Sequence, residues 1–375
     1  MELSAAQRAI RETVRELTAE EIVPVAREAD RTESFPEDVW DLLADLDLTG
    51  LTTPTAYDGF DADYRTYAVV NEELAYGSLA VATALSVHCL ATACIAEFAG
   101  ESVRDEWLPE MVDGRPVGAF ALSEPQAGSN PRAMTTVAEP IDDGYRLSGE
   151  KQWITNGQRA GVVVVFAKTD PEDPDSITQF LVPTDSDGLT VGDPEEKLGL
   201  RASDTTTLTF DGVRIPERYR LTEVGAGLAA ALSILNGGRV AIAAQATGLA
   251  QRALDEAQGY ATEREQFDEP IAELQTIRHK LAEMATTVQA SRLLTWDAAG
   301  RLDRDADARQ AASMAKYFAS EGAVDVANEA VQIHGGYGYT TEYPVERLYR
   351  DAKVTTIYEG TTEIQKNVIA RSLLE

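Results

Sequence analysis

Three short stretches of the sequence carry side chains that could hold a ligand or move a proton. The first, Phe120–Asn130, is rich in turn-forming and hydroxyl residues. The second, residues 151–157, combines a lysine, a tryptophan, a threonine and an Asn-Gly turn. In the third, residues 358–365, Glu359 precedes a glycine, which would let a ligand approach the backbone closely. A carboxylate in such a loop is a candidate general base.

The third stretch also predicts the start of the last helix. Thr362 and Gln365 have the spacing of a capping box. Glu359 then lies in the loop before the helix, where the positive end of the helix dipole favours a carboxylate. Two interpretations of Glu359 follow: electrostatic support of a helix start, or a base held in a binding site.

The sequence gives no indication of a metal site, a disulfide or a dinucleotide-binding loop. The chain contains three histidines, His88, His279 and His334. None of them has a partner at the spacing of metal ligands, so we expect no metal site. Cys89 and Cys94 fall on one predicted helix and do not share a face, which argues against a disulfide. Residues 225–227 read Gly-Ala-Gly without the third glycine of a dinucleotide fingerprint.

The charge of the chain is strongly negative and evenly spread. Lys and Arg number 33 against 63 Asp and Glu, for a formal net charge of −30. This pattern predicts a solvated, halophilic surface adapted to concentrated salt, and no binding to nucleic acid or anionic membranes. Near the N-terminus, Ser4 and Gln7 match a helix capping box rather than a secretion signal, so we expect a cytoplasmic protein. The uncharged stretch Leu74–Ala96 is long enough to cross a bilayer, but its Ala, Ser and Thr content favours one buried helix and no membrane span.

The elements that must position these residues change in character twice along the chain. Helical spacing of apolar residues continues to about residue 115. Short β-type runs then alternate with turn pairs, including Asp211-Gly212, which we expect to separate two strands. Helical texture returns after Gly225. The prediction is an α+β multidomain protein with an all-α domain over 1–116, a β barrel or sandwich over 117–222 and an α-helical domain over 223–375. Junctions between such layers favour ligands.

Taken together, the three stretches resemble the acyl-CoA dehydrogenase family, FAD enzymes that desaturate acyl-CoA thioesters between the α and β carbons. The resemblance covers essentially the whole chain. Further segments match in the same order: residues 197–203, residues 264–267 with Gln275, residues 332–339, and residues 349–352. The resemblance implies a C-terminal four-helix bundle, FAD at the junction of the domains, and a role in fatty acid or branched-chain amino acid catabolism.

The resemblance also implies roles for particular residues. The flavin ring would be held by Phe120, Leu122, Ser123, Ser129, Trp153, Ile154 and Thr155. The diphosphate and adenine would be contacted from a neighbouring subunit by Arg264, Phe267, Gln275, Gln332, Gly335 and Gly336, and from the same chain by Thr361 and Glu363. The substrate would touch Ser129, Asn236, Arg239 and Gly360. An ordinary core position for Trp153 and a solvated charge for Arg264 are the alternative interpretations.

Glu359 occupies the position of the family's usual catalytic base. Some members carry their glutamate on another helix, at a position that is Gly238 here, which leaves Glu359 as the available carboxylate. Burial would raise its basicity while the thioester acidifies the α-proton. Glu359 would take that proton as the β-hydride passes to FAD.

Four positions depart from the family pattern. They are Gln126, Asn130, Asn236 and Asp268. None removes a reacting group, but Asp268 would place a carboxylate near the FAD diphosphate and repel it. Concentrated salt would screen this repulsion, so FAD affinity is expected to depend on salt.

The resemblance implies an acyl-CoA substrate, an electron-transferring flavoprotein as the electron acceptor, and a homotetramer. Alternatives are an oxidase or other flavoenzyme on the same scaffold, which would react quickly with oxygen, and a non-catalytic acyl-CoA-binding protein. The sequence does not select the acyl chain length. A glutaryl substrate needs a cation at its far end, which the family's glutaryl enzymes place in the segment that is Leu74–Val103 here, and this segment contains no Lys or Arg.

Overall fold

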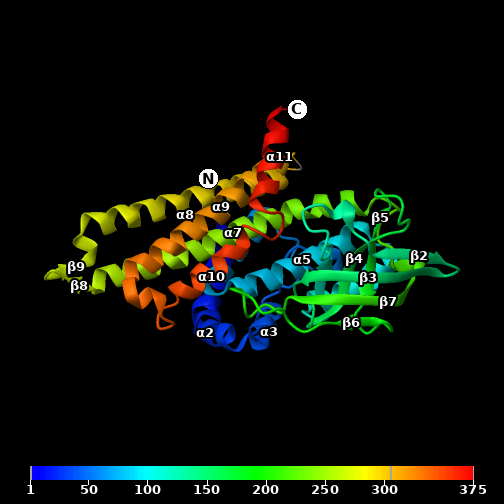
Figure 1. The fold of residues 1–375 in the computed structure, drawn as a ribbon, viewed down its shortest axis with the longest axis horizontal. Helices are drawn as coiled ribbons and strands as arrows, with labels where there is room; N and C mark the ends of the chain where they lie inside the picture. The colour runs from blue at the N-terminus through cyan, green and yellow to red at the C-terminus, as the bar shows by residue number, and fades with distance from the viewer. Residues whose placement is uncertain (1, 305, 375) are drawn as a thin grey trace.

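The structure, a computed structural model, describes residues 2–304 and 306–374 and has the predicted order of helices, β domain and helices (Figure 1). The α-helices are α1 (Ala5–Leu17), α2 (Val23–Thr32), α3 (Glu37–Asp45), α4 (Tyr64–Gly77), α5 (Leu79–Phe98), α6 (Glu101–Val112), α7 (Gly227–Glu263), α8 (Gln275–Leu302), α9 (Arg309–His334), α10 (Val345–Thr355) and α11 (Thr362–Leu374). The strands are β1 (Val117–Ala121), β2 (Val137–Ile141), β3 (Gly144–Ile154), β4 (Ala160–Lys168), β5 (Ile177–Pro183), β6 (Leu189–Val191), β7 (Thr206–Pro216), β8 (Glu265–Gln266) and β9 (Glu269–Pro270).

The N-terminal helices begin with the predicted capping box. Ser4 Oγ accepts from the backbone N–H of Gln7 over 3.1 Å, and Gln7 Oε1 accepts from the N–H of Ser4 over 3.0 Å. The uncharged stretch Leu74–Ala96 is not one helix as predicted, because Ser78 adopts an extended conformation between α4 and α5. By length and composition α5 and α7 could each cross a membrane, but 89% and 67% of their most apolar windows are buried here. Helix α5 is thus a core helix.

The β domain is one sheet in the order β1-β4-β2-β3-β7-β6, with β5 added beside β4. The alternating burial of β3 and the nearly continuous burial of β4 place β4 in the middle of the core. Asp211-Gly212 does not separate two strands, contrary to prediction. It lies inside β7, where Gly212 has a φ of +67° and the pairing with β3 shifts register, so the dipeptide forms a bulge in one long strand.

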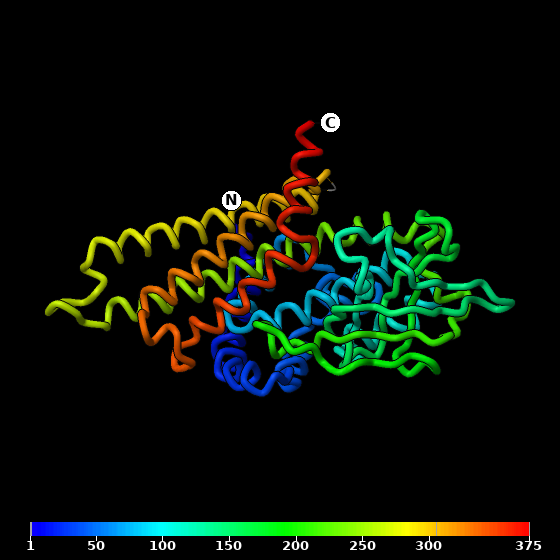
Figure 2. Tube along the Cα trace, in the orientation of Figure 1, coloured from blue at the N-terminus to red at the C-terminus, as the bar shows by residue number. Residues whose placement is uncertain are grey.

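The C-terminal region is built on the long helices α7, α8 and α9, which run alongside one another (Figure 2). Alanine-rich faces let these helices approach closely, and their buried alanines join α4 and α5 in one core cluster. The β8–β9 hairpin connects α7 to α8 at the end of the bundle remote from the β domain (Figure 1). Helix α11 projects from the bundle near the junction with the β domain (Figure 2).

Candidate functional site

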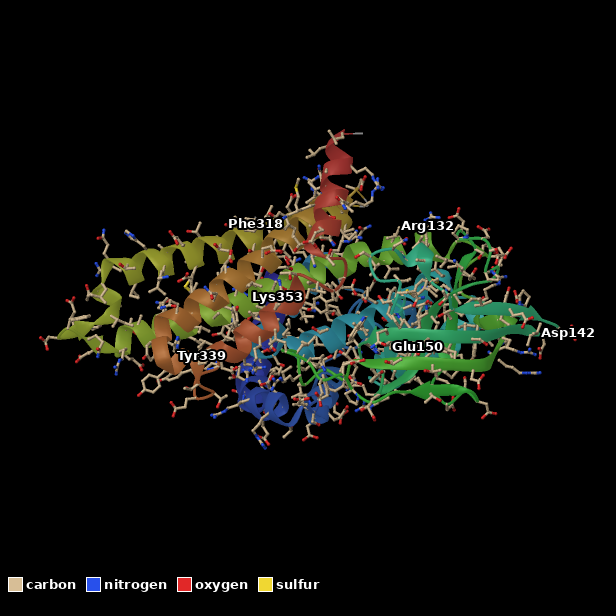
Figure 3. The ribbon with its side chains drawn as sticks, in the orientation of Figure 1. Arg132, Asp142, Glu150, Phe318, Tyr339 and Lys353 are labelled. Atoms are coloured by element: carbon tan, nitrogen blue, oxygen red, sulfur yellow. The ribbon has the colours of Figure 1, made fainter. Side chains whose placement is uncertain are left out.

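A cavity of about 580 Å³ opens where the three regions of the chain meet, and we call it the junction pocket. Its volume is in the range of small-molecule sites. Lys353, which lines it from α10, lies near the middle of the molecule in Figure 3. The pocket is lined by Thr83, Ser86, Val87, Leu90, Phe120, Gly128, Ser129, Trp153, Thr155, Lys197, Leu198, Gly199, Leu200, Thr205, Gly238, Ile242, Arg350, Lys353, Val354, Ile357, Tyr358, Glu359, Gly360 and Thr361.

Glu359 is the buried carboxylate of this pocket. Its φ of +53° is left-handed, a conformation that costs a residue with a side chain about 1–2 kcal/mol. Its Oε2 is buried and has no hydrogen-bond partner among the described residues. Burial raises the pKa of Glu359 to about 6, against the opposing effect of two nearby cations. The side chain therefore has the environment of a base that works near neutral pH.

Gly238 of α7, which occupies the family's alternative base position, faces this carboxylate. A Cβ built on Gly238 would lie 3.0 Å from Glu359 Oε2. A side chain at position 238 would therefore reach the same part of the pocket as the Glu359 carboxylate and would crowd it.

Two buried cations surround Glu359 without lining the pocket. Arg239 of α7 donates to Asn236 Oδ1 over 2.7 Å, while its Nε is buried without a partner among the described residues. Lys316 of α9 donates to the Gly360 carbonyl over 2.8 Å. Burial lowers the pKa of Lys316 to about 8, and Glu359 opposes this effect. Sequence reasoning did not identify Lys316, although its spacing from the buried Ala312 and Ala319 places it on the inner face of α9.

A buried ion pair joins the first two of the three candidate stretches. Lys151 Nζ lies 2.7 Å from Glu124 Oε1, and both side chains are almost completely buried. Lys151 also donates to the Leu122 carbonyl over 3.2 Å. Burial alone would raise the pKa of Glu124, but the Lys151 ammonium and hydrogen bonds from Thr135 and Thr136 outweigh it and lower the pKa to about 2. The pair fixes the two loops against each other.

The predicted flavin-binding residues divide between the pocket lining and the loop framework. Phe120, Ser129, Trp153 and Thr155 line the pocket, and Trp153 is 60% exposed, so it is not a core aromatic. Three others lie outside the lining: the Leu122 carbonyl is bound by Lys151, the Ser123 carbonyl accepts from the N–H of Gln152 over 3.0 Å, and the Ile154 side chain is in the core. The structure therefore places these three residues in the loop framework beside the pocket and not in its lining.

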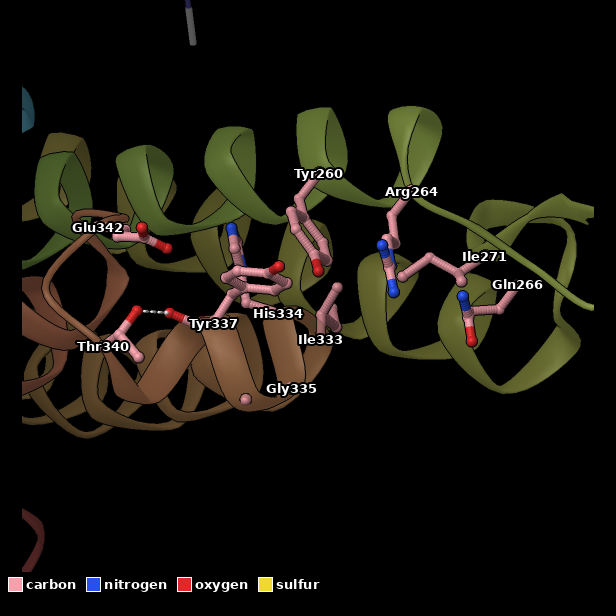
Figure 4. Close-up of a pocket in the computed structure, with 11 residues that line it drawn as sticks. Tyr260, Arg264, Gln266, Ile271, Ile333, His334, Gly335, Tyr337, Thr340 and Glu342 are labelled. Carbon is pink, nitrogen blue, oxygen red and sulfur yellow. Dashed lines mark hydrogen bonds between the residues drawn. The ribbon is translucent and has the colours of Figure 1, made fainter.

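A second cavity, of about 510 Å³, lies at the β8–β9 end of the bundle, and we call it the hairpin pocket (Figure 4). Arg264, Gly335 and Gly336 line it, beside the stacked rings of Tyr260 and His334, whose centroids are 4.3 Å apart. The full lining is Tyr260, Arg264, Gln266, Ile271, Ile333, His334, Gly335, Gly336, Tyr337, Thr340 and Glu342.

Most of the remaining predicted site residues lie outside both linings; Gly360 and Thr361 are the exceptions and line the junction pocket. Phe267, Gln275 and Gln332 are exposed around the hairpin pocket, with Phe267 84% exposed. Thr361 lines the junction pocket, whereas Glu363 is exposed on α11. Asn236 and Arg239 are behind the pocket wall on α7. Within one chain, the structure does not bring the hairpin-pocket group together with Glu359.

The start of α11 differs from the predicted capping box. The N–H of Ile364 donates to Thr361 Oγ1 over 3.4 Å, so Thr361 and not Thr362 caps the helix. Thr362 instead donates to Glu321 Oε1 over 2.5 Å. Gln365 Nε2 donates to the carbonyls of Glu359 and Gly360 rather than receiving from a backbone N–H. The prediction of a Thr362–Gln365 capping box was wrong because Glu321 of α9 accepts the hydrogen bond of the Thr362 hydroxyl.

Bare backbone in both pockets fits a bound cofactor. A Cβ built at Gly128 or Gly336 would meet nothing within 4 Å, so packing inside the chain does not require glycine at these two positions, whereas the φ of +59° at Gly335 favours glycine by itself. The partnerless Glu359 Oε2 and the exposed Trp153 also lie in the junction pocket. Exposed glycine backbone, an exposed indole and an unpaired carboxylate oxygen are all accounted for by a large ligand with polar and aromatic parts.

The fold has a helical, a β and a second helical region, with a buried carboxylate where they meet. This combination defines a flavoenzyme of the acyl-CoA dehydrogenase type, and comparison with known proteins supports the assignment. Models of the N-terminal, middle and C-terminal domains of acyl-CoA dehydrogenases match residues 4–115, 119–213 and 225–374. The chain therefore belongs to the acyl-CoA dehydrogenase family of oxidoreductases, which act on CH–CH groups. The predicted family and fold are confirmed.

Individual relatives agree over the full length. The chain is 41% identical to the mitochondrial short-chain specific acyl-CoA dehydrogenase of Rattus norvegicus, over 100% of this chain and 91% of the relative. It is 37% identical to the butyryl-CoA dehydrogenase of Megasphaera elsdenii, with a TM-score of 0.97 and all of both chains covered. A chain solved in a study of the electron transferring flavoprotein of Acidaminococcus fermentans is 36% identical, with a TM-score of 0.98 over 100% of this chain and 99% of that one.

The cofactor prediction is confirmed as well, because the family is FAD-dependent. A glutaryl-CoA dehydrogenase from Mycobacterium smegmatis, solved in complex with FADH2, is 32% identical with a TM-score of 0.94, over 99% of this chain and 95% of that chain. The residues of the junction and hairpin pockets are suited to the same group.

Proposed function

We propose that this enzyme removes the α-proton and β-hydride of a short, uncharged acyl-CoA to give the trans-2-enoyl-CoA. Glu359 takes the α-proton, and the electron pair of that C–H bond becomes the new C=C bond as the β-hydrogen leaves with its own pair. FAD, when bound, supplies the hydride acceptor. Hydrogen bonds to the thioester carbonyl stabilise the negative charge that develops on its oxygen.

The observation that carries this proposal is the state of Glu359. Its carboxylate is buried and lines the pocket, and one of its oxygens has no hydrogen-bond partner among the described residues. The missing side chain of Gly238 leaves space beside that oxygen. A carboxylate that merely supported a helix start would be solvated, and its pKa would not be raised. The arrangement instead suits proton abstraction from a bound thioester.

The acyl end of the pocket favours a short chain. The N-terminal wall comes from Thr83, Ser86, Val87 and Leu90 of α5, and Gln245 of α7 lies behind it. Ser86 accepts from Gln245 Nε2 over 3.0 Å, so this end is closed by a buried polar network rather than by open apolar space. The similarity to short-chain and butyryl enzymes supports the same assignment.

We further propose a cytoplasmic homotetramer that passes electrons to an electron-transferring flavoprotein. The hairpin pocket is lined from the end of α7 and from β8, which lie at the end of the bundle remote from the β domain (Figure 1). We infer that its residues reach the FAD of the junction pocket from another subunit. The similarity to a chain studied with an electron transferring flavoprotein supports the acceptor. The formal charge of −30 supports work in concentrated salt.

An anaerobic titration of the holoenzyme with acyl-CoAs, followed by flavin absorbance, tests the substrate. We expect butyryl-CoA to bleach the flavin, octanoyl-CoA to do so poorly, and glutaryl-CoA to do so poorly because α5 offers no Lys or Arg at the pocket wall. Equal turnover of glutaryl-CoA would overturn this exclusion. Rapid reaction of the reduced enzyme with oxygen would indicate an oxidase instead.

A further inference from the structure

Helix α9 carries a fully buried lysine next to the turn that holds Glu359. The Lys316 side chain has no exposed surface, and its Nζ donates to the Gly360 carbonyl over 2.8 Å. Within the described part of the chain, no ion pair at 4.0 Å or less includes this ammonium. A buried ammonium has three donors and is costly unless its surroundings compensate it. Lys316 therefore occupies a position that packing alone does not favour.

The same turn is held by a second side chain. Gln365 Nε2 donates to the Glu359 carbonyl over 3.2 Å and to the Gly360 carbonyl over 2.9 Å. The Gly360 carbonyl thus accepts from both Lys316 and Gln365. Because Glu359 and Gly360 have φ values of +53° and +92°, the turn is in the left-handed region at two consecutive residues. These donors hold the backbone in that conformation.

The charge of Lys316 also faces the carboxylate that the turn presents. Arg239 reaches the same carboxylate from α7, and Tyr67 of α4 and Tyr358 are its other ionisable neighbours. On the other side, Lys316 faces Glu321 of α9 and Glu363 of α11. Since Glu359 Oε2 has no hydrogen-bond partner among the described residues, its placement depends on the backbone turn and on these charges.

We propose that Lys316 is a positioning residue for the base: it fixes the Glu359–Gly360 turn through the Gly360 carbonyl and stabilises the ionised carboxylate through its charge. Lys316 does not line the junction pocket, so it acts through Glu359 and does not touch substrate. The inference rests on the proposed function of Glu359 as the base.

The test isolates proton transfer from hydride transfer. A 3-thiaacyl-CoA has acidic α-protons but no β C–H bond, so exchange of its α-protons with D2O reports the base alone. We would measure exchange against pH in wild type, Lys316→Met, Lys316→Arg and Glu359→Gln. Lys168→Met, which removes another buried lysine in β4, is the matched control. Binding of the analogue, FAD retention and thermal unfolding are measured on the same samples.

Lys316→Met should slow exchange by about 10- to 100-fold, since a misplacement of about 1 Å can cost that much. The pH midpoint of exchange should rise, because the lost cation had favoured the carboxylate. Analogue binding and FAD retention should match Lys168→Met, and Lys316→Arg should recover part of the exchange. If Lys316→Met does not fold, Lys316→Gln, which removes the charge and keeps an N–H donor on a shorter side chain, should still show the raised midpoint.

Wild-type exchange with an unchanged midpoint in Lys316→Met would overturn the inference. So would losses of exchange, binding and thermal stability that move together, since they would show a structural role only. Full exchange by Glu359→Gln would instead refute the base and with it the proposed function. Loss of exchange in Glu359→Gln with wild-type behaviour of Lys316→Met would refute only the role of Lys316.

Discussion

At the scale of single residues, the proposed reaction depends on one carboxylate, that of Glu359. Glu359→Gln keeps the shape of the side chain and removes the proton acceptor. Flavin reduction by acyl-CoA should fall by at least about 10²- to 10⁴-fold, the usual contribution of a general base, while FAD and acyl-CoA still bind. Anaerobic stopped-flow absorbance measures the rate. A variant that keeps more than about a tenth of the wild-type rate would point to another base.

The environment of the same carboxylate predicts a pH dependence. Burial raises the pKa of Glu359 to about 6, and only the ionised form can accept the proton. The rate of flavin reduction at low acyl-CoA concentration should therefore be lost as pH falls through about 6 and level off above it. The titratable and charged neighbours of Glu359 are Arg239, Lys316, Tyr67 and Tyr358. A midpoint near 4, as for a solvated glutamate, would contradict the buried environment.

The sequence identified Glu359 but not the residues that support it. Glu359 stands in a short motif, and motifs are local. Lys316 lies 43 positions earlier and meets Gly360 only because α9 packs against the turn before α11. Glu124 and Lys151 were quoted with their loops, but their pairing across the β domain is a tertiary contact. Residues that are far apart in the sequence and meet only in the folded chain are hard to recognise from a single sequence.

At the scale of elements, the Glu124–Lys151 pair holds two pocket-forming loops together. Lys151→Met would leave the Glu124 carboxylate buried without its cation and should lower the free energy of unfolding by about 3–5 kcal/mol. FAD should be retained more weakly, because the loops at Phe120–Asn130 and 151–157 lose their common anchor. Denaturant unfolding and flavin fluorescence measure the two effects.

A double variant provides the control for this pair. Glu124→Gln with Lys151→Met removes both charges and keeps one of the two side-chain oxygens that accept from the backbone N–H groups of Thr135 and Thr136. It should be more stable than Lys151→Met alone. The ion pair also has a pH signature: because the folded pKa of Glu124 is lowered to about 2, its contribution is present above its unfolded pKa and is lost as pH falls toward 2. Equal stability of the single variant and wild type would refute the anchoring role.

Boundaries of helices and strands were predicted correctly where neighbouring residues determine them. They were missed where the expected local signal did not match the folded chain. The Ser4 cap follows from a hydroxyl and an amide three residues apart, and it formed as expected. Asp211-Gly212 has the composition of a hairpin turn, but β3 continues past it, so it became a bulge. The break at Ser78 follows Gly77, and this Gly-Ser pair is a local signal that the prediction of one helix overlooked.

At the scale of the whole molecule, the tip of the β8–β9 hairpin beside the hairpin pocket is exposed. Phe267 and Asp268, with φ values of +59° and +68°, form the tip of the β8–β9 hairpin, and the Phe267 ring is largely exposed. Phe318 is exposed on the outer face of α9 (Figure 3). Exposed aromatic side chains of this kind are common at subunit contacts. An assembly in which one subunit's hairpin covers another's junction pocket would place Asp268 near the FAD diphosphate.

In the proposed tetramer, assembly, FAD binding and the salt concentration would be coupled. A tetramer would carry four times the formal charge of −30. At about 0.01 M salt the screening length is about 30 Å, so subunits repel one another, whereas near 1 M it falls to about 3 Å. Dilution into low salt should therefore release FAD in step with loss of the tetramer. Light scattering and flavin fluorescence followed together through a KCl titration measure both. A tetramer that keeps FAD at low salt would refute the coupling.

Two substitutions at Asp268 distinguish the effect of its charge from the effect of backbone strain on FAD release at low salt. Asp268→Asn removes the carboxylate and keeps a side chain that tolerates a left-handed φ, whereas Asp268→Gly also relieves the turn at φ +68°. If repulsion of the diphosphate sets the salt dependence, both variants should retain FAD to lower KCl than wild type. An effect of Asp268→Gly alone would assign the gain to the hairpin backbone. Dissociation with FAD still bound would show that Arg264, Gly335 and Gly336 do not hold the neighbouring subunit's cofactor.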